Sequence, residues 1–101
     1  MVLAVLGLNH KTVSVDIREK FSISEESARD GLLHLSEQEG IKEAVVLSTC
    51  NRTEIYAVLK DEDDKEELYH FFLTLSGNSK AEKEYFFFYT GTAVSYTHLT
   101  L

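Results

Sequence analysis

The chain has 101 residues, with ten basic and 17 acidic side chains and a formal net charge of −7. This length suits one small domain, and a composition of 44% apolar and 27% charged residues excludes a disordered chain or a disulfide scaffold. The acidity argues against a simple nucleic-acid-binding protein, which typically carries a basic patch. The excess is local, however, because residues 61–67 hold six acids and one base and contribute −5 of the total.

The chain has one cysteine, Cys50, which cannot form an internal disulfide. A lone cysteine favours a reducing compartment or a thiol with a chemical role. The apolar run at residues 2–8 lacks a basic flank and is too short to span a bilayer or to serve as a secretory signal. We therefore expect a cytoplasmic protein that does not enter a membrane.

The first half of the chain predicts a strand, a short helical turn and a helix. Residues 2–8 are apolar without alternation, which is typical of a strand buried on both faces. Residues 16–20 suit a short helical turn. Apolar side chains at helical spacing then predict a helix over residues 24–38.

The ends of that helix carry two sequence signals. Ser22 and Glu25 have the spacing of a capping box at its beginning. Gly40 stands where a glycine in the left-handed conformation commonly ends a helix.

Two strands joined by a hairpin come next. Residues 43–48 form an apolar run, and in residues 53–60 apolar side chains alternate at the period of a strand. Only a few polar residues around 49–52 separate the two runs, which favours a hairpin.

The last elements are a helix and an aromatic strand. Asp63 and Glu66 suggest a second capping box, and Gly77 a helix end. An apolar stripe at helical spacing lies between them, formed by Leu68, Phe71, Phe72 and Leu75. Residues 85–89 are an aromatic run of strand type.

The order β-α-β-β-α-β predicts an α+β domain of the ferredoxin-like class. We expect one four-stranded antiparallel sheet with two helices on one face. The five glycines never form a G-x-G motif, so the chain has no dinucleotide fingerprint. Its four histidines are far apart in sequence, and His34 and His70 are expected at helix surfaces, so we predict no metal site.

The segment Ser48-Thr49-Cys50-Asn51-Arg52-Thr53-Glu54 is a dense polar cluster between the two hairpin strands. Such turns often present functional side chains on a rigid scaffold. A nearby cation such as Arg52, or His10 if the first strand lies beside the hairpin, can favour the thiolate of Cys50. The alternative is that Cys50 is an inert small hydrophobic residue.

Three blocks resemble the N-terminal catalytic domain of glutamyl-tRNA reductase. They are G-L-N-H-K-T at residues 7–12, I-R-E-K at residues 17–20 and S-T-C-N-R-T-E-I-Y at residues 48–56. The spacing between the blocks matches as well as their letters, and the resemblance runs from residue 1 to about residue 90.

This resemblance implies the activity of a longer enzyme. The family reduces the glutamyl ester carried on tRNA(Glu) to glutamate-1-semialdehyde with NADPH, the first step of the five-carbon route to 5-aminolevulinate and tetrapyrroles. An NADPH-binding Rossmann domain and a helical dimerisation domain would follow this one, so no cofactor-binding residue is expected in this chain. The implied partners are glutamyl-tRNA(Glu), a second copy in a homodimer, and the downstream semialdehyde aminomutase.

The resemblance also assigns roles to individual residues. Cys50 matches the family's nucleophile, and the glutamate-binding stretch matches Thr49, Cys50, Asn51 and Arg52. A cysteine thiolate can displace the tRNA hydroxyl from the activated ester and leave a thioester. The planar fork of Arg52 suits the side-chain carboxylate of glutamate. Asn9 and His10 are candidates for positioning substrate, with a polar strand end as the alternative.

The end of the chain departs from the family pattern. The family's histidine would fall at Tyr96, whereas His98 comes two positions later. We therefore expect a domain over residues 1–94 and an aberrant or truncated tail over residues 95–101, with a two-residue insertion as the alternative. His98 is kept as a second catalytic candidate.

A non-enzymatic alternative stands beside this interpretation. A ferredoxin-like module could bind a ligand or a partner and keep Cys50 as a structural residue. Formation of a glutamyl adduct on Cys50 discriminates between the two hypotheses.

Overall fold

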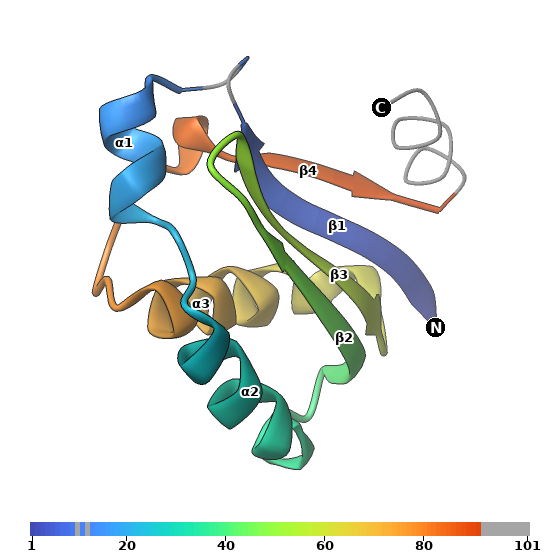
Figure 1. The fold of residues 1–101 in the computed structure, drawn as a ribbon. Helices are drawn as coiled ribbons and strands as arrows, with labels where there is room; N and C mark the ends of the chain where they lie inside the picture. Colours follow the sequence, from blue (N-terminus) through green and yellow to red (C-terminus); the bar gives the residue numbers. More distant parts are fainter. Residues whose placement is uncertain (10, 12, 92–101) are drawn as a thin grey trace.

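Four strands and three helices make up the described part of the computed structural model, which comprises residues 1–9, 11 and 13–91 (Figure 1). The strands are β1 (Val2–Asn9), β2 (Ile41–Ser48), β3 (Arg52–Leu59) and β4 (Phe87–Thr90). The helices are α1 (Val15–Lys20), α2 (Glu25–Leu33) and α3 (Lys65–Ser76).

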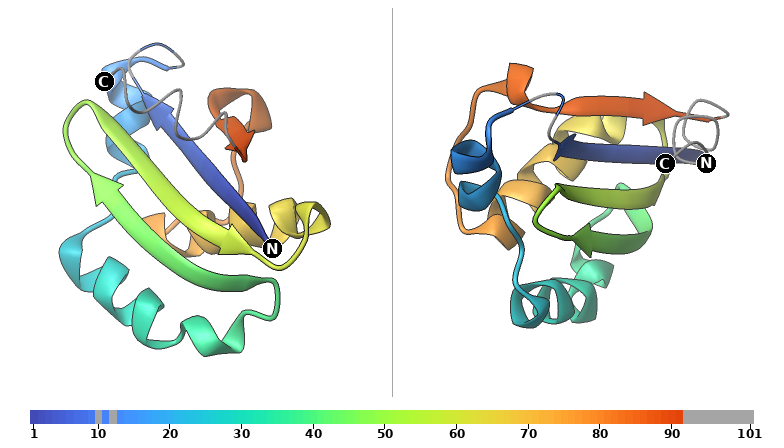
Figure 2. Two further views of the ribbon diagram at one scale, coloured as in Figure 1. Left: turned by 90° about the vertical axis from the view of Figure 1, so that its right-hand side faces the viewer. Right: turned by 45° about the horizontal axis from the view of Figure 1, so that its top comes forward.

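The strands form one sheet in the order β2-β3-β1-β4, and every neighbouring pair is antiparallel. Strand β3 lies between β1 and β2, so the connection from β1 through the helices to β2 skips one strand. Helices α2 and α3 pack on the same side of the sheet (Figures 1 and 2). The expected α+β architecture with a four-stranded antiparallel sheet and helices is confirmed, and the expected turn at residues 16–20 is the short helix α1.

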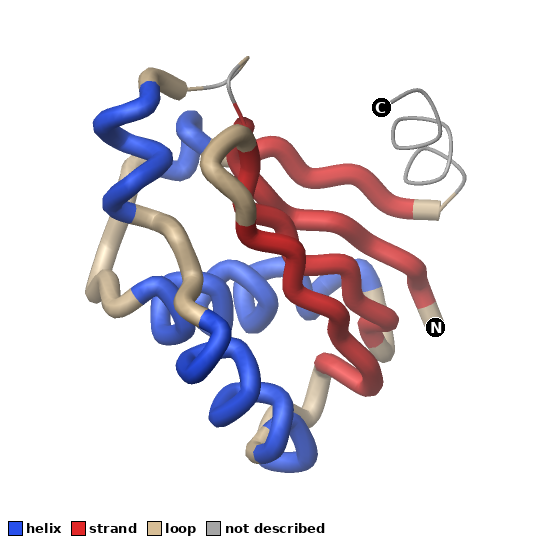
Figure 3. Tube along the Cα trace, in the orientation of Figure 1, coloured by secondary structure: helices blue, strands red, loops and turns tan. Residues whose placement is uncertain are grey.

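Helix α3 lies against one face of the sheet (Figure 3), and the hydrophobic core fills the space between them. The predicted stripe of α3 is buried, with Phe72 fully inaccessible to solvent. Alternate residues of β1 and β3 meet it from the sheet, namely Ala4, Leu6, Leu8, Ile55, Ala57 and Leu59. Because side chains alternate along a strand, the residues between these lie on the opposite face of the sheet. We call this the far face.

The far face carries apolar side chains that are partly open to solvent. Leu3, Val45 and Tyr89 are exposed by 43, 63 and 39%. Its centre is closed, however, because residues 4–8 of β1 are all buried between β3 and β4. The prediction that the first strand is buried on both faces therefore holds for residues 4–8 but not for Leu3.

The first long helix begins and ends differently from the prediction. Ser24 is its N-cap, since its Oγ accepts a hydrogen bond from the Ser27 N–H at 3.0 Å. The hydroxyl of Ser22 instead donates to the carbonyl of Glu19. The predicted helix over residues 24–38 stops at His34, and a separate 3₁₀ turn follows at Leu35–Glu37.

Gly40 does not end a helix in the left-handed conformation, because only Gly77 and Gly91 have positive φ among the described residues. Its lack of a side chain matters for another reason: a Cβ atom there would collide with the carboxyl group of Asp64. The backbone N–H of Gly40 also donates to the carboxylate of Glu67, at 3.1 and 3.2 Å to its two oxygens. A contact distant in sequence therefore explains this glycine.

Helix α3 also lacks the predicted capping box. Its N-cap is Asp64 without a side-chain cap, and the nearest cap is one turn earlier, where the Asp61 carboxylate accepts from the Asp63 N–H at 3.5 Å. The predicted end is confirmed, since Gly77 adopts φ 77°.

The aromatic strand is shorter than predicted, because residues 83–85 form a 3₁₀ turn before β4 begins. Phe86 enters the core beside this turn and makes edge-to-face contacts with Phe21, Tyr69 and Phe72 at centroid distances of 5.6, 5.4 and 5.1 Å. No helix in the described part of the chain has the length and apolar character needed to cross a membrane.

Candidate functional site

The turn between β2 and β3 is shaped by the side chain of Thr49. The Thr49 N–H donates to the Arg52 carbonyl at 2.8 Å, and the Thr49 Oγ1 accepts from the N–H groups of Asn51 and Arg52, each at 3.2 Å. Neither Cys50 nor Asn51 has a positive φ. The turn is therefore not of the primed type that dominates two-residue hairpins, and the threonine hydroxyl binds two N–H groups instead.

Cys50 lies at the tip of this turn as an exposed free thiol. Exposure makes its sulfur accessible to an electrophile, and the Thr49 hydrogen bonds hold the backbone on either side of it. The candidate residues Thr49, Cys50, Asn51 and Arg52 follow one another along this turn and into the start of β3.

The strand residues that flank the turn are tied to the segment that precedes α2. Ser48 Oγ accepts a hydrogen bond from the Ile23 N–H at 3.1 Å and lies 3.4 Å from Thr53 Oγ1. Thr53 is 1% exposed and belongs to the buried side of β3. The two strand ends that carry the turn are thus fixed by packing and hydrogen bonds.

Three polar side chains of β3 follow one another on the far face. Glu54 is fully buried, and its Oε1 accepts a hydrogen bond from the Tyr56 hydroxyl at 2.7 Å. The same oxygen lies 3.9 Å from Nε of Arg52, whose side chain is 31% exposed. Burial and the hydrogen bond to Glu54 raise the pKa of the Tyr56 hydroxyl above its ordinary value of 10. Tyr56 therefore remains a hydrogen-bond donor throughout the neutral range.

Gly7 lies opposite Glu54 in the neighbouring strand β1. A Cβ atom at Gly7 would approach the Glu54 Cγ to 2.7 Å and the Thr53 carbonyl oxygen to 2.7 Å. Since ordinary contacts of this kind are 3.4–4 Å, the buried glutamate occupies space that a side chain at position 7 would need.

The candidates from the end of β1 are only partly described. Asn9 pairs with Arg52 across β1 and β3, and its Oδ1 accepts from the Lys11 N–H at 2.9 Å. The end of β1 thus lies beside the hairpin strand β3, and Asn9 is opposite Arg52. His10 and His98 lie outside the described residues.

Sequence reasoning did not select Gly7, Glu54 or Tyr56 as site residues. The available signal was the two-residue alternation, which puts residues 52, 54 and 56 on one face of β3. The position of Gly7 opposite Glu54 depends on the register between β1 and β3, which the sequence pattern does not predict.

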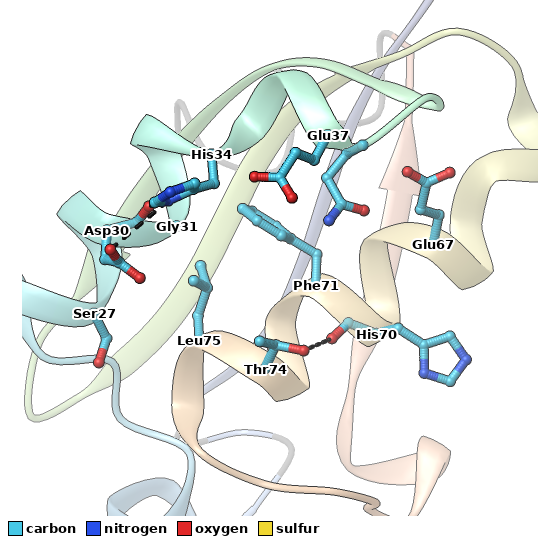
Figure 4. Close-up of a pocket in the computed structure, with 11 residues that line it drawn as sticks. Ser27, Asp30, Gly31, His34, Glu37, Glu67, His70, Phe71, Thr74 and Leu75 are labelled. Carbon is cyan, nitrogen blue, oxygen red and sulfur yellow. Dashed lines mark hydrogen bonds and ion pairs between the residues drawn. The ribbon is translucent and has the colours of Figure 1, made fainter.

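A groove of about 740 Å³ lies away from the hairpin, between α2 and α3 (Figure 4). Phe71 and Leu75 line it beside Gly31, and His34 binds the Asp30 carbonyl at 2.9 Å. This hydrogen bond, followed by the nearby carboxylates, raises the pKa of His34. His70 points away from His34 in Figure 4. Both histidines are exposed, as predicted, and the described residues contain no group of three His, Cys, Asp or Glu side chains suited to a metal ion.

Comparisons with known proteins match most of the chain to one family. The family model "Glutamyl-tRNAGlu reductase, N-terminal domain" matches residues 6–100. The chain is 44% identical over 78 residues to glutamyl-tRNA reductase from Desulforudis audaxviator, covering 77% of this chain and 18% of that protein. The corresponding protein from Synechocystis is 47% identical over 78 residues, with the same coverage.

A solved structure is similar as well. Glutamyl-tRNA reductase from Methanopyrus kandleri matches with a TM-score of 0.61 and 26% sequence identity. The match covers 89% of this chain and 19% of that chain. The present chain thus spans less than one fifth of the length of these relatives.

Proposed function

Because the chain belongs to the family of glutamyl-tRNA reductase N-terminal domains, we propose that it is the domain in which Cys50 takes the glutamyl group from glutamyl-tRNA(Glu). The observation that carries this proposal is the placement of an exposed free thiol beside Arg52 on a turn fixed by Thr49. In the longer enzyme this step would precede reduction to glutamate-1-semialdehyde.

The proposed step is an acyl transfer. The Cys50 thiolate attacks the carbonyl carbon of the aminoacyl ester, and the bond from that carbon to the ribose oxygen breaks. The product is a glutamyl thioester on Cys50, and the released ribose hydroxyl takes up a proton. The exposed position of Cys50 supports this role, because the acceptor end of a tRNA is a large substrate that must approach from solvent.

Arg52 is the residue that we propose to recognise the side-chain carboxylate of glutamate. Its guanidinium carries N–H groups in a fork that matches a carboxylate, and its side chain is partly exposed at the start of β3. Glutamine lacks the negative charge, so the same fork would bind it less strongly. Asn9, opposite Arg52, and Asn51 on the turn supply further polar groups near the proposed substrate.

NADPH, which the family uses, does not fit the described residues. A dinucleotide site needs a glycine-rich turn from a strand into a helix N-terminus. Here Gly7 is inside β1, and Gly77 follows the end of α3. Gly31 is inside α2 and faces Leu75 of α3. We therefore assign NADPH binding and homodimer formation to further domains of the longer enzymes, and derive no hydride step for this chain.

Two finer assignments are part of the same proposal. The split connection between β1 and β2 supports a ferredoxin-like domain. Residues 1–94 are proposed as its extent, with residues 95–101 as an aberrant tail, although the family match runs on to residue 100. Sequencing genomic DNA across codons 90–101 tests this boundary, and a native reading frame through them would overturn it.

The acyl transfer is tested by intact-mass measurement after incubation with glutamyl-tRNA(Glu). We expect an adduct of one glutamyl group, located on Cys50 by peptide mapping. A parallel arm uses a glutamate α-thiobenzyl ester, which transfers its glutamyl group to a thiol without any contact to tRNA.

The matched control is Cys50→Ser, which changes one exposed atom and should fold normally while forming no adduct. Arg52→Lys keeps the charge but loses the fork, and we expect slower acylation. A folded chain that stays unmodified with both substrates would contradict the proposal and favour the non-enzymatic module.

A further inference from the structure

Arg52, Glu54 and Tyr56 form a row on the far face of β3 because side chains two residues apart point to the same side of a strand. Arg52 is nearest to the Cys50 turn, and Tyr56 is farthest from it. The row therefore connects the interior of the sheet with the turn along one rigid strand.

Glu54 joins the other two side chains through a single oxygen atom. Its Oε1 accepts from the Tyr56 hydroxyl at 2.7 Å and lies 3.9 Å from Nε of Arg52. A buried carboxylate is costly unless it is paired and hydrogen-bonded, and Glu54 is fully buried. The Tyr56 hydrogen bond thus fixes the point toward which the Arg52 Nε is drawn.

The surroundings of Glu54 leave its side chain little freedom. Gly7 and Leu47 are its cross-strand neighbours, and the gap at Gly7 is filled by Glu54 itself. Because Glu54 is fully buried and its Cγ fills the space beside Gly7, its carboxylate can act as an anchor for a side chain that reaches the surface.

Arg52 benefits from such an anchor. Its stem is long and flexible, and its side chain is 31% exposed, so the guanidinium would otherwise sample several rotamers. With Nε held toward Glu54, the two terminal nitrogens remain available to a ligand carboxylate. Side chains ordered before binding lose less entropy when the ligand arrives.

We propose that Tyr56 is a positioning residue for amino-acid selectivity, which orients the Arg52 fork through its hydrogen bond to Glu54. This inference rests on the proposed function and adds to it a residue whose hydroxyl does not touch the substrate. Selectivity for glutamate over glutamine would depend on Tyr56 as well as on Arg52.

A structural role for Tyr56 alone would give a different result. Loss of packing or stability would lower acylation by glutamate and by glutamine in the same proportion. Loss of positioning would weaken only the interaction with a negatively charged side chain. The ratio of the two acylation rates therefore separates the two roles.

The test compares Tyr56→Phe with Tyr89→Phe in the full 101-residue chain. Both tyrosines face Val5 from opposite sides in the same cross-strand row, so the second variant is a matched control. The probes are tRNA(Glu) charged with glutamate and tRNA(Glu) charged with glutamine, and the readout is the rate of adduct formation on Cys50. Contributions of the tRNA to binding cancel in the ratio.

We expect Tyr56→Phe to reduce the glutamate preference about tenfold, which corresponds to the lower end of the range for one hydrogen bond to a charged group. Tyr89→Phe should leave the preference unchanged. An unchanged preference in Tyr56→Phe, or equal losses with both charged tRNAs, would overturn the inference.

A second measurement keeps the inference separate from the proposed function. Exchange of the Arg52 Nε–H proton with water, followed by NMR, should be faster in Tyr56→Phe than in Tyr89→Phe. If the wild-type chain forms no adduct, the proposed function fails, and equal exchange rates in the two variants would then overturn the positioning role as well.

Discussion

The close approach between β1 and β3 predicts that Gly7→Ala destabilises the domain. An alanine Cβ would lie 2.7 Å from both the Glu54 Cγ and the Thr53 carbonyl oxygen, about 0.7 Å short of an ordinary contact. One of these atoms belongs to the backbone of the central sheet and the other to a fully buried side chain. Neither can move without disturbing its neighbours.

Two opposing effects set the size of the change. Overpacking of this kind costs about 1–3 kcal/mol, whereas replacing glycine by alanine inside a strand gains about 0.5–1 kcal/mol. The steric cost exceeds the gain, so we expect the free energy of unfolding to fall by about 1–2 kcal/mol. For a domain of this length that corresponds to a melting temperature lowered by about 5–15 °C.

Urea unfolding followed by circular dichroism measures this change, and a pair of second-site variants tests its cause. Glu54→Gln keeps the Cγ atom, so the cost of Gly7→Ala should persist in that background. Glu54→Ala removes the Cγ atom, so the cost should shrink there to the part that comes from the Thr53 oxygen. A Gly7→Ala variant as stable as the wild type, or an equal cost in both backgrounds, would refute the reasoning.

Two further predictions concern the helices. Ser24→Ala should lower the free energy of unfolding by about 1 kcal/mol because it removes the N-cap of α2. Ser22→Ala should lower it clearly less. If urea unfolding gave the reverse order, the cap assignment would be wrong. The Lys83 ammonium donates to Glu66 at 2.6 Å, and this hydrogen bond is the main cause that lowers the Glu66 pKa from 4.5. This pair should stabilise the fold above pH 4.5 and lose its effect as the pH falls through the lowered pKa. In Lys83→Met the Glu66 pKa, measured by NMR titration, should rise, and an unchanged value would show that the pair does not form in solution.

Local periodicity predicted the elements whose buried side chains can be identified without knowing what they pack against. The stripe of α3 and its terminator Gly77 are of this kind, because a helix face and a left-handed glycine need no information from distant residues. The hairpin was predicted for the same reason, since two apolar runs flank one short polar segment. Thr49 and Cys50 are neighbours within that segment, so their placement on one turn follows from the local pattern alone.

The features that the sequence did not predict depend on distant contacts or on a choice between equivalent local signals. The space beside Gly40 is occupied by Asp64, and its N–H donates to Glu67; both residues are far along the chain and reach Gly40 only in the folded domain. Ser22 and Ser24 offer similar spacing to the residues that follow, and only the fold decides which hydroxyl meets a free N–H group. The burial of Glu54 follows from the strand order, which places β1 beside β3.

In the proposed acyl transfer, the nucleophile and the recognition of its substrate depend on different parts of the hairpin. Cys50 is on a turn whose backbone conformation depends on the Thr49 hydroxyl, whereas Arg52 is the first residue of a strand and is oriented by Glu54. A change at Thr49 should therefore alter the position of the thiol, while a change at Tyr56 should alter the selectivity for the amino acid. Because the burial of Glu54 depends on the space beside Gly7, the proposed selectivity would be linked to the packing of the sheet, whereas the position of the thiol would be linked to the turn.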